Sequence, residues 1–168
     1  MTRLKLVLLI RFIQLVGLPK CFGDNHVVCD YVRRLLNYGA YVSWVQDHLV
    51  QAQYWHDPLD ETTYAAKSVF LADINNERPH AKTQEYKDNL LKLEKLVLIK
   101  FEGDSVVDPV ETEWFGFYKP GQAKTILPYN QTDLYTRDAI GLRTLEQTGR
   151  LDLLSVPGTF NPFKTKLC

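Results

Sequence analysis

The sequence has no excess of charge of either sign. Its 168 residues contain 20 Lys and Arg against 20 Asp and Glu, so the formal net charge is zero. A nucleic-acid partner or an acidic membrane surface would favour a basic surplus. The composition therefore supports neither partner, and we expect no binding to nucleic acid.

The chain also lacks an apolar run long enough to cross a membrane, which takes about 20 residues. Two basic residues precede the apolar run 6–10, Arg11 interrupts it, and a second short run covers residues 12–16. This start resembles a signal peptide, but no small-residue cleavage site follows it. A buried strand or an atypical start explains residues 1–16 at least as well.

Cysteine is scarce, with three residues in the whole chain. Cys21 and Cys29 are close enough in sequence to close a short loop, and Cys168 stands at the very end. Three reduced thiols fit the spacing, and so does a disulfide, which would stabilise by about 2–3 kcal/mol and imply an oxidising compartment. Cys21, His26 and Cys29 could also bind a metal, but a fourth ligand with suitable spacing is missing.

What the chain does have is the composition of one globular domain, 45% hydrophobic and 12% aromatic. Helical periodicity dominates residues 29–95. We predict helical segments over 29–54, with Val42, Val45 and Leu49 on one apolar stripe, and further helices over 61–67 and 82–95. The break between the first two comes at His56-Asp-Pro58, because proline disfavours helix in the residue before it.

The periodicity changes after residue 95. Residues 96–101 (LVLIKF) form a nearly continuous apolar run that is typical of a central parallel strand buried on both faces. We predict a turn at Pro120-Gly121, a helix over 136–148 that Gly149 ends, and a second short strand over 151–154. This order favours an α/β fold. Two good strands are few for a parallel sheet, so the chain looks like part of a domain.

Asp104 is the main candidate for chemistry. In open α/β sheets, functional side chains lie in loops beyond the carboxyl ends of strands, and Asp104 has that place after 96–101. Position alone fits a capping aspartate better than a catalytic one. Asp108 is a second candidate, but its Asp-Pro context is typical of a turn.

A hydrolase triad also needs a nucleophile and a base. None of the four serines, Ser43, Ser68, Ser105 and Ser155, lies in a G-x-S-x-G elbow. All four histidines, His26, His48, His56 and His80, precede Asp104, whereas α/β-hydrolases place the base after the acid. We therefore expect the chain not to catalyse hydrolysis by itself.

Five segments in fixed order carry a family resemblance: 17–21 (GLPKC), 52–58 (AQYWHDP), 69–75 (VFLADIN), 104–109 (DSVVDP) and 113–118 (EWFGFY). Together they resemble the palmitoyl-protein thioesterases. Residues 121–124 and 134–136 extend the likeness, which covers about 17–154.

The resemblance implies an incomplete α/β-hydrolase fold. In it, residues 17–154 form the C-terminal part of the hydrolase domain. A mostly helical insertion over about 22–95 acts as a lid that helps to form the acyl groove, and it precedes a late parallel strand. Residues 149–154 still follow the pattern of the family's last strand. Residues 1–16 and 155–168 do not resemble the family.

The resemblance also implies a function. The family hydrolyses the thioester between palmitate and protein cysteines in the lysosome, without metal or cofactor, so S-palmitoylated proteins or peptides are the expected partners. Asp104 matches the triad acid, and Cys21 and Cys29 match a family disulfide. The catalytic histidine should follow the last strand, but Phe160 stands at that position. Asn130-Gln-Thr132 is a glycosylation match without a family counterpart.

We interpret the chain as a fragment or truncated isoform of such an enzyme. Two alternatives stay open. One is a non-catalytic module that binds acyl chains or proteins through the helical insertion. The other is a polypeptide that does not fold stably, because sheet edges and apolar faces are left uncovered.

Overall fold

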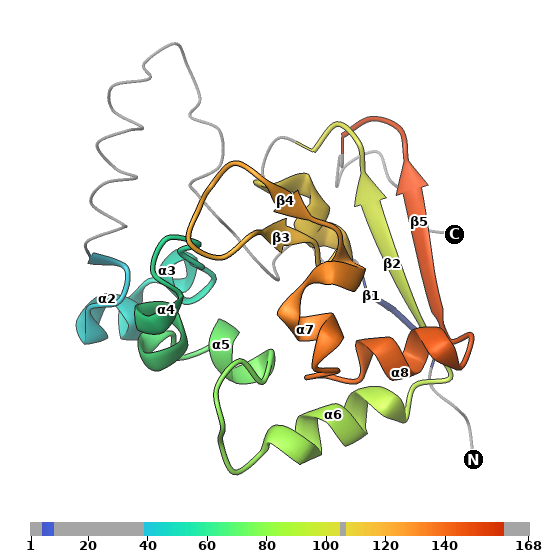
Figure 1. The fold of residues 1–168 in the computed structure, drawn as a ribbon, viewed down its shortest axis with the longest axis horizontal. Helices are drawn as coiled ribbons and strands as arrows, with labels where there is room; N and C mark the ends of the chain where they lie inside the picture. Colours follow the sequence, from blue (N-terminus) through green and yellow to red (C-terminus); the bar gives the residue numbers. More distant parts are fainter. Residues whose placement is uncertain (1–4, 9–38, 105–106, 160–168) are drawn as a thin grey trace.

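A computed structural model describes residues 5–8, 39–104 and 107–159. The expectations for Cys21, His26, Cys29, Phe160 and Cys168 lie outside these residues. Figure 1 shows a sheet on one side and the short helices α2 to α5 on the other, with α7 between them and α6 and α8 along the bottom.

The sheet has three parallel strands in the order β1-β2-β5. They are β1 (Lys5–Leu8), β2 (Lys95–Phe101) and β5 (Leu151–Val156). The two predicted strands are confirmed as β2 and β5. The third, β1, lies in the segment where a strand was one of the alternatives, and its four residues pair with the first four of β2.

From Lys95 to Ile99, the central strand β2 alternates in burial. Leu96 and Leu98 are fully buried, whereas Val97 and Ile99 on the other face are half-buried. The prediction of a central parallel strand is confirmed, and burial on both faces holds in part, because Phe101, on the face of Val97 and Ile99, is buried. The buried face packs against the region of α7 (Asp133–Thr136) and α8 (Leu142–Gln147) in one core cluster, which comprises Leu93, Leu96, Leu98, Phe115, Leu134, Ile140, Leu142 and Leu145.

The helical region has a second small core. Its helices are α2 (Ser43–His48), α3 (Val50–Gln53), α4 (Glu61–Lys67), α5 (Leu71–Ile74) and α6 (Thr83–Leu91). The core cluster consists of Ala40, Tyr41, Ala52, Trp55, Tyr64, Leu71 and Ala72. The prediction for 61–67 is confirmed as α4, where the Asp60 side chain caps the helix by accepting the Thr63 N–H at 3.0 Å.

The apolar stripe predicted for α2 does not pack as a stripe. Val45 contacts the second core, but Val42 and Leu49 are 52% and 44% exposed. The buried residue of α2 is Gln46, whose amide donates to the Ala40 and Ala52 carbonyls and accepts from the Val69 N–H. These three hydrogen bonds of the Gln46 side chain, to backbone groups before α2, in α3 and after α4, place the Gln46 face of α2 inward.

The helix predicted over 82–95 ends early, at Leu91. The Arg150 guanidinium, at the start of β5, donates to the carbonyls of Leu91 and Leu93 at 2.8 and 3.0 Å. Unpaired carbonyls at a helix end need such donors. The helix therefore ends at Leu91, and β2 can begin at Lys95.

The helix predicted over 136–148 is shorter than expected, because α7 ends at Thr136 and α8 covers only Leu142–Gln147. Asp138 and Gly141 have φ values of 52° and 89°, which interrupt the helix between α7 and α8. The Asp138 carboxylate accepts from the Thr144 N–H at 3.1 Å and pairs with Lys87 Nζ at 2.9 Å. The predicted end at Gly149 is confirmed, since Gly149 has a φ of 67°.

The stretch between β2 and α7 contains a small hairpin that the sequence pattern did not predict. After the 3-10 helix η1 (Val110–Trp114), β3 (Phe117–Tyr118) pairs antiparallel with β4 (Ile126–Leu127). The predicted turn at Pro120-Gly121 lies in the connection, with Gly121 at a φ of 79°. A second 3-10 helix, η2 (Tyr129–Gln131), leads into α7.

Candidate active site

Asp104 lies just beyond the carboxyl end of β2, as the sequence predicts. Its N–H donates to the Phe101 carbonyl at 3.0 Å, and its Oδ1 accepts from the Val107 N–H at 3.3 Å. The first bond closes a turn directly after the strand. The second is the self-capping contact expected of an aspartate in a loop, so Asp104 does cap the loop, and this does not conflict with a catalytic role.

The chain that follows β5 runs beside the Asp104 turn. Glu102 N–H donates to the Val156 carbonyl at 3.0 Å, and Gly103 N–H donates to the Gly158 carbonyl at 2.9 Å. A Cβ at Gly103 would lie 3.0 Å from Gly158 backbone atoms. The glycine is therefore needed for close approach of two loops. Phe160 follows two residues after Gly158, outside the described residues.

Glu113 and Trp114, on η1, hold the end of β2 from the other side. Glu113 is 2% exposed, and its Oε2 accepts the Phe101 N–H at 2.7 Å. Trp114 Nε1 donates to the Leu98 carbonyl at 3.3 Å. In the sequence this pair is recognisable only as part of the family-like segment 113–118, because nothing local marks a glutamate as buried.

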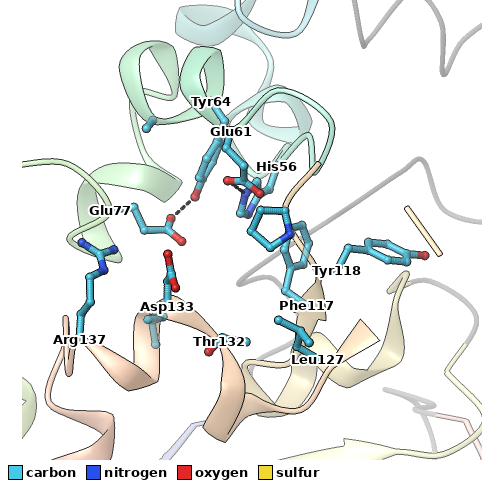
Figure 2. A pocket seen from close by; sticks show the side chains of 13 residues that line it. His56, Glu61, Tyr64, Glu77, Phe117, Tyr118, Leu127, Thr132, Asp133 and Arg137 are labelled. Atoms are coloured by element: carbon cyan, nitrogen blue, oxygen red, sulfur yellow. Dashed lines mark hydrogen bonds and ion pairs between the residues drawn. The ribbon is translucent and has the colours of Figure 1, made fainter. Parts of the chain in front are cut away.

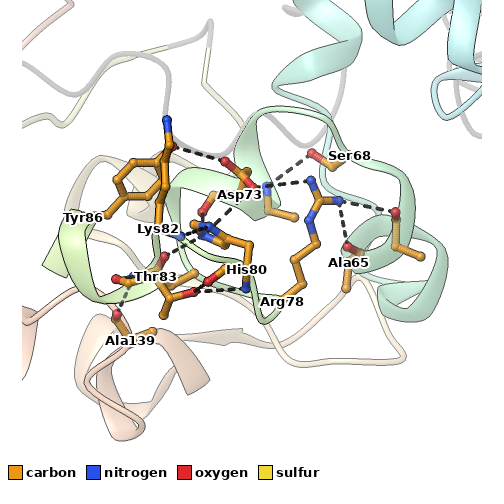
Figure 3. A network of polar contacts seen from close by, with 12 residues as sticks. Ala65, Ser68, Asp73, Arg78, His80, Lys82, Thr83, Tyr86 and Ala139 are labelled. Atoms are coloured by element: carbon orange, nitrogen blue, oxygen red, sulfur yellow. Dashed lines mark hydrogen bonds and ion pairs between the residues drawn. The ribbon is translucent and has the colours of Figure 1, made fainter.

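The described histidines are engaged away from Asp104. His48 bonds to the Trp44 carbonyl at 2.8 Å, and His56 Nε2 lies 2.7 Å from Glu61 Oε2. His80 belongs to the polar network around Asp73 and Arg78 (Figure 3). Its Nδ1 accepts from the Lys82 N–H, so Nε2 carries the proton and donates to the Asp73 carbonyl at 3.0 Å. His26 lies outside the described residues.

The described serines have structural surroundings. Ser68 is fully buried and accepts the Ala72 N–H at 3.2 Å, and Ser155 donates to Glu102 Oε1 at 2.7 Å. Ser43 is the exposed first residue of α2, and Ser105 lies outside the described residues. None of the three described serines is held in a sharp strand-to-helix turn.

The other candidates lie at the surface. Asp108 is exposed and precedes Pro109 through a cis peptide bond, which agrees with a turn context. Asn130 is exposed on η2, and the hydroxyl of Thr132, the third residue of its sequon, donates to the Tyr129 carbonyl at 2.7 Å. The described residues contain no group of three His, Cys, Asp or Glu side chains that could hold a metal ion.

A cavity of about 440 Å³ lies between α4, β3, β4 and α7 (Figure 2). Its wall includes His56, whose ring stacks between Tyr64 and Phe117 with centroid distances of 3.6 and 4.1 Å. The Tyr64 hydroxyl donates to Glu77. Burial raises the pKa of the Glu77 carboxyl above its ordinary value.

The sequence of nearly the whole chain matches one family model. Residues 11–160 match the model described as palmitoyl protein thioesterase.

This chain belongs to the palmitoyl protein thioesterase family. It is 53% identical over 142 residues to palmitoyl-protein thioesterase 1 of Caenorhabditis elegans, a match that covers 84% of this chain and 47% of the relative. It is 39% identical over 130 residues to palmitoyl-protein thioesterase 3 of Dictyostelium discoideum, covering 77% and 45%. It is 37% identical over 112 residues to lysosomal thioesterase PPT2 of Mus musculus, covering 67% and 36%.

The chain thus spans less than half the length of each of these relatives. The family is hydrolytic and has an α/β-hydrolase fold, and the parallel sheet with its helices agrees with that class. The predicted fold class and family are confirmed. No helix in the described part of the chain has both the length and the apolar character that a membrane crossing requires.

Proposed function

We propose that this chain is the part of a palmitoyl-protein thioesterase that supplies the triad acid, Asp104. In the complete reaction, a serine attacks the thioester carbonyl and a histidine removes its proton. The acid orients that histidine and stabilises the imidazolium. The C–S bond breaks, the cysteine thiol leaves with the proton from the histidine, and water then hydrolyses the acyl-serine to release palmitate. No metal or cofactor takes part.

One observation supports the role of Asp104 above the others. The Gly103 to Gly158 hydrogen bond of 2.9 Å holds the turn before Asp104 against the chain that leaves β5. The base of an α/β-hydrolase follows the acid in sequence and must reach it in space. The segment after β5 is therefore the place from which a base could contact Asp104.

The 168-residue chain itself should not turn over substrate. Its residue at the proposed base position is Phe160, which cannot accept a proton, and none of its serines lies in a G-x-S-x-G elbow. Compared with the alternative of a non-catalytic binding module, the family match favours a thioesterase whose serine and histidine are supplied by sequence that this chain lacks.

The remaining features belong to the same proposal. Residues 17–154 would form the C-terminal part of the hydrolase domain, with the acyl-groove insertion over about 22–95. Cys21 and Cys29 would form a disulfide, and Asn130 would carry a glycan, as expected of a protein that passes through the secretory pathway to the lysosome. The name lysosomal thioesterase of the mouse relative supports that destination.

A chimera tests the role of Asp104. Residues 17–154 of this chain would replace the matching segment of the Caenorhabditis elegans relative, which keeps that protein's remaining sequence. We expect hydrolysis of a palmitoyl-cysteine peptide. Asp104→Asn should lower kcat roughly 10³–10⁴-fold, the loss typical of removing a triad acid.

Asp108→Asn is the matched control, because Asp108 is an exposed aspartate four residues away. We expect the fold-loss of kcat in Asp108→Asn to be at least about 100 times smaller than the fold-loss in Asp104→Asn. A folded chimera that keeps full activity with Asn at position 104 would contradict the proposal. Turnover by the unmodified 168-residue chain would contradict the expectation that it is inactive by itself.

A further inference from the structure

The cavity of Figure 2 has a wall of hydrogen-bond acceptors that comes from three separate segments. Glu61 belongs to α4, Glu77 follows α5, and Asp133 begins α7. Figure 2 shows the three carboxylates turned toward the same space. Carboxylates accept hydrogen bonds and cannot donate them when ionised. A ligand for this space must therefore bring donors.

Two of these carboxylates already have partners, and the third does not. Glu61 bonds to His56, and Glu77 bonds to Tyr64 and Asn75. Within the described part of the chain, the Asp133 side chain has neither a hydrogen bond nor an ion pair. Asp133 thus presents an unpaired carboxylate at the cavity, with the Arg137 guanidinium in the same lining.

His56 adds an independent sign of a missing donor. Its side chain is almost completely buried in the cavity wall, and Nδ1 has no hydrogen-bond partner among the described residues. When Nε2 carries the ring proton and donates to Glu61, Nδ1 is an acceptor. Buried acceptors normally find a donor, so this one is an exception.

The rest of the wall suits an aliphatic stem. Phe117, Leu127, Leu134 and Pro120 line the cavity, together with the Tyr118 ring. Aromatic faces also attract cations. Arg137 is the one basic side chain other than histidine in the described lining, so three carboxylates face a single guanidinium.

We propose that this cavity binds a primary ammonium group on a short aliphatic stem, supplied by a lysine side chain of a peptide or by a free alkylamine. The ammonium group donates three hydrogen bonds and accepts none, which matches the acceptors around it. The volume of about 440 Å³ accommodates the stem. Binding here does not depend on hydrolysis through Asp104.

Titration of the full chain by heteronuclear NMR tests this site. The probes are n-butylammonium, a blocked tripeptide with a central lysine, and the same tripeptide with norleucine. We expect the amides of Thr132, Asp133 and Tyr118 to shift with the two cationic probes and not with norleucine. A lysine tripeptide that binds more tightly than butylammonium would identify peptide as the source, and the reverse order would identify a free amine.

Two variants are expected to change amine binding in opposite directions, which a general loss of folding would not do. Asp133→Asn should weaken amine binding about tenfold, as loss of one charge-assisted contact predicts. Arg137→Gln should strengthen it, because a competing cation is removed. Asp47→Asn, an exposed aspartate on α2 outside the cavity, and Asp104→Asn should leave it unchanged.

The proposal is overturned by equal binding of the norleucine peptide, by no binding of any cationic probe, or by weaker binding in Arg137→Gln. If Asp133→Asn does not fold, Glu61→Gln replaces it, since glutamine keeps an acceptor for His56 while losing the charge. Because Asp104→Asn leaves amine binding intact, failure of the amine site and failure of the proposed thioesterase role are distinguishable.

Discussion

At the residue scale, Gly103 shows how one position can determine the geometry around Asp104. Its φ lies outside the left-handed region, so backbone freedom is not the reason for glycine here. The reason is space, because a Cβ would lie 3.0 Å from the Gly158 backbone and 3.3 Å from Thr159 Cγ2. A contact with backbone cannot be relieved by a side-chain rotation.

We expect Gly103→Ala to lower the free energy of unfolding by about 1–3 kcal/mol, the usual cost of overpacking. Urea unfolding followed by circular dichroism measures it. Gly39→Ala is the control, since nothing lies within 4 Å of a Cβ there. An equal stability of both variants would show that the two loops separate without cost.

At the element scale, β2 connects the sheet to the helices that cover it. Leu98 on β2 is fully buried in the first core cluster, and it pairs in register with Leu153 of β5. Leu154, the next residue of β5, is 47% exposed. The two neighbouring strands therefore contain leucines with very different surroundings.

Leu98→Ala should cost about 2–5 kcal/mol of unfolding free energy, because a buried leucine leaves a cavity. Leu154→Ala should cost much less, about 0.5 kcal/mol, as expected of an exposed position. Chemical denaturation of both variants gives the comparison. Similar losses at the two positions would mean that β5 is covered in solution by something outside the described residues.

At the scale of the whole molecule, the buried carboxyl of Glu77 makes the stability of the fold depend on pH. Burial raises the pKa of Glu77 above its ordinary value of 4.5, although the neighbouring His56 and the Tyr64 hydroxyl act in the opposite direction. A carboxyl with a raised pKa holds its proton more tightly in the folded chain. Its stabilising contribution is complete below pH 4.5 and is lost as the pH rises through the raised pKa.

We therefore expect the chain to be more stable at pH 5 than at pH 7. Glu77→Gln should flatten this dependence and raise the stability at pH 7, because the amide has no charge to bury. Urea midpoints at both pH values measure the effect, with exposed Glu94→Gln as control. Hydrogen bonds from Thr63 lower the pKa of Asp60 below 3.8, so its opposite contribution changes only at lower pH. An unchanged pH dependence in Glu77→Gln would assign the effect to other groups.

Much of the fold was predictable where the signal is local. The apolar run of β2, the helix α4 and the end of α8 at Gly149 all depend on neighbours in sequence. The length of α6 was not predictable in this way. It depends on Arg150, which comes 59 residues after the Leu91 carbonyl that it binds.

The sequence by itself determined the family, the fold class and the position of Asp104 after β2, because characteristic segments and a buried strand can be recognised without contacts. Only the tertiary structure decided which face of α2 is buried, where the helix predicted over 136–148 begins, and which side chains line the cavity. Gln46, Asp138 and Asp133 contribute to these features through partners or neighbours brought together by folding. Such contacts have no periodicity along the chain, so no sequence pattern predicts them.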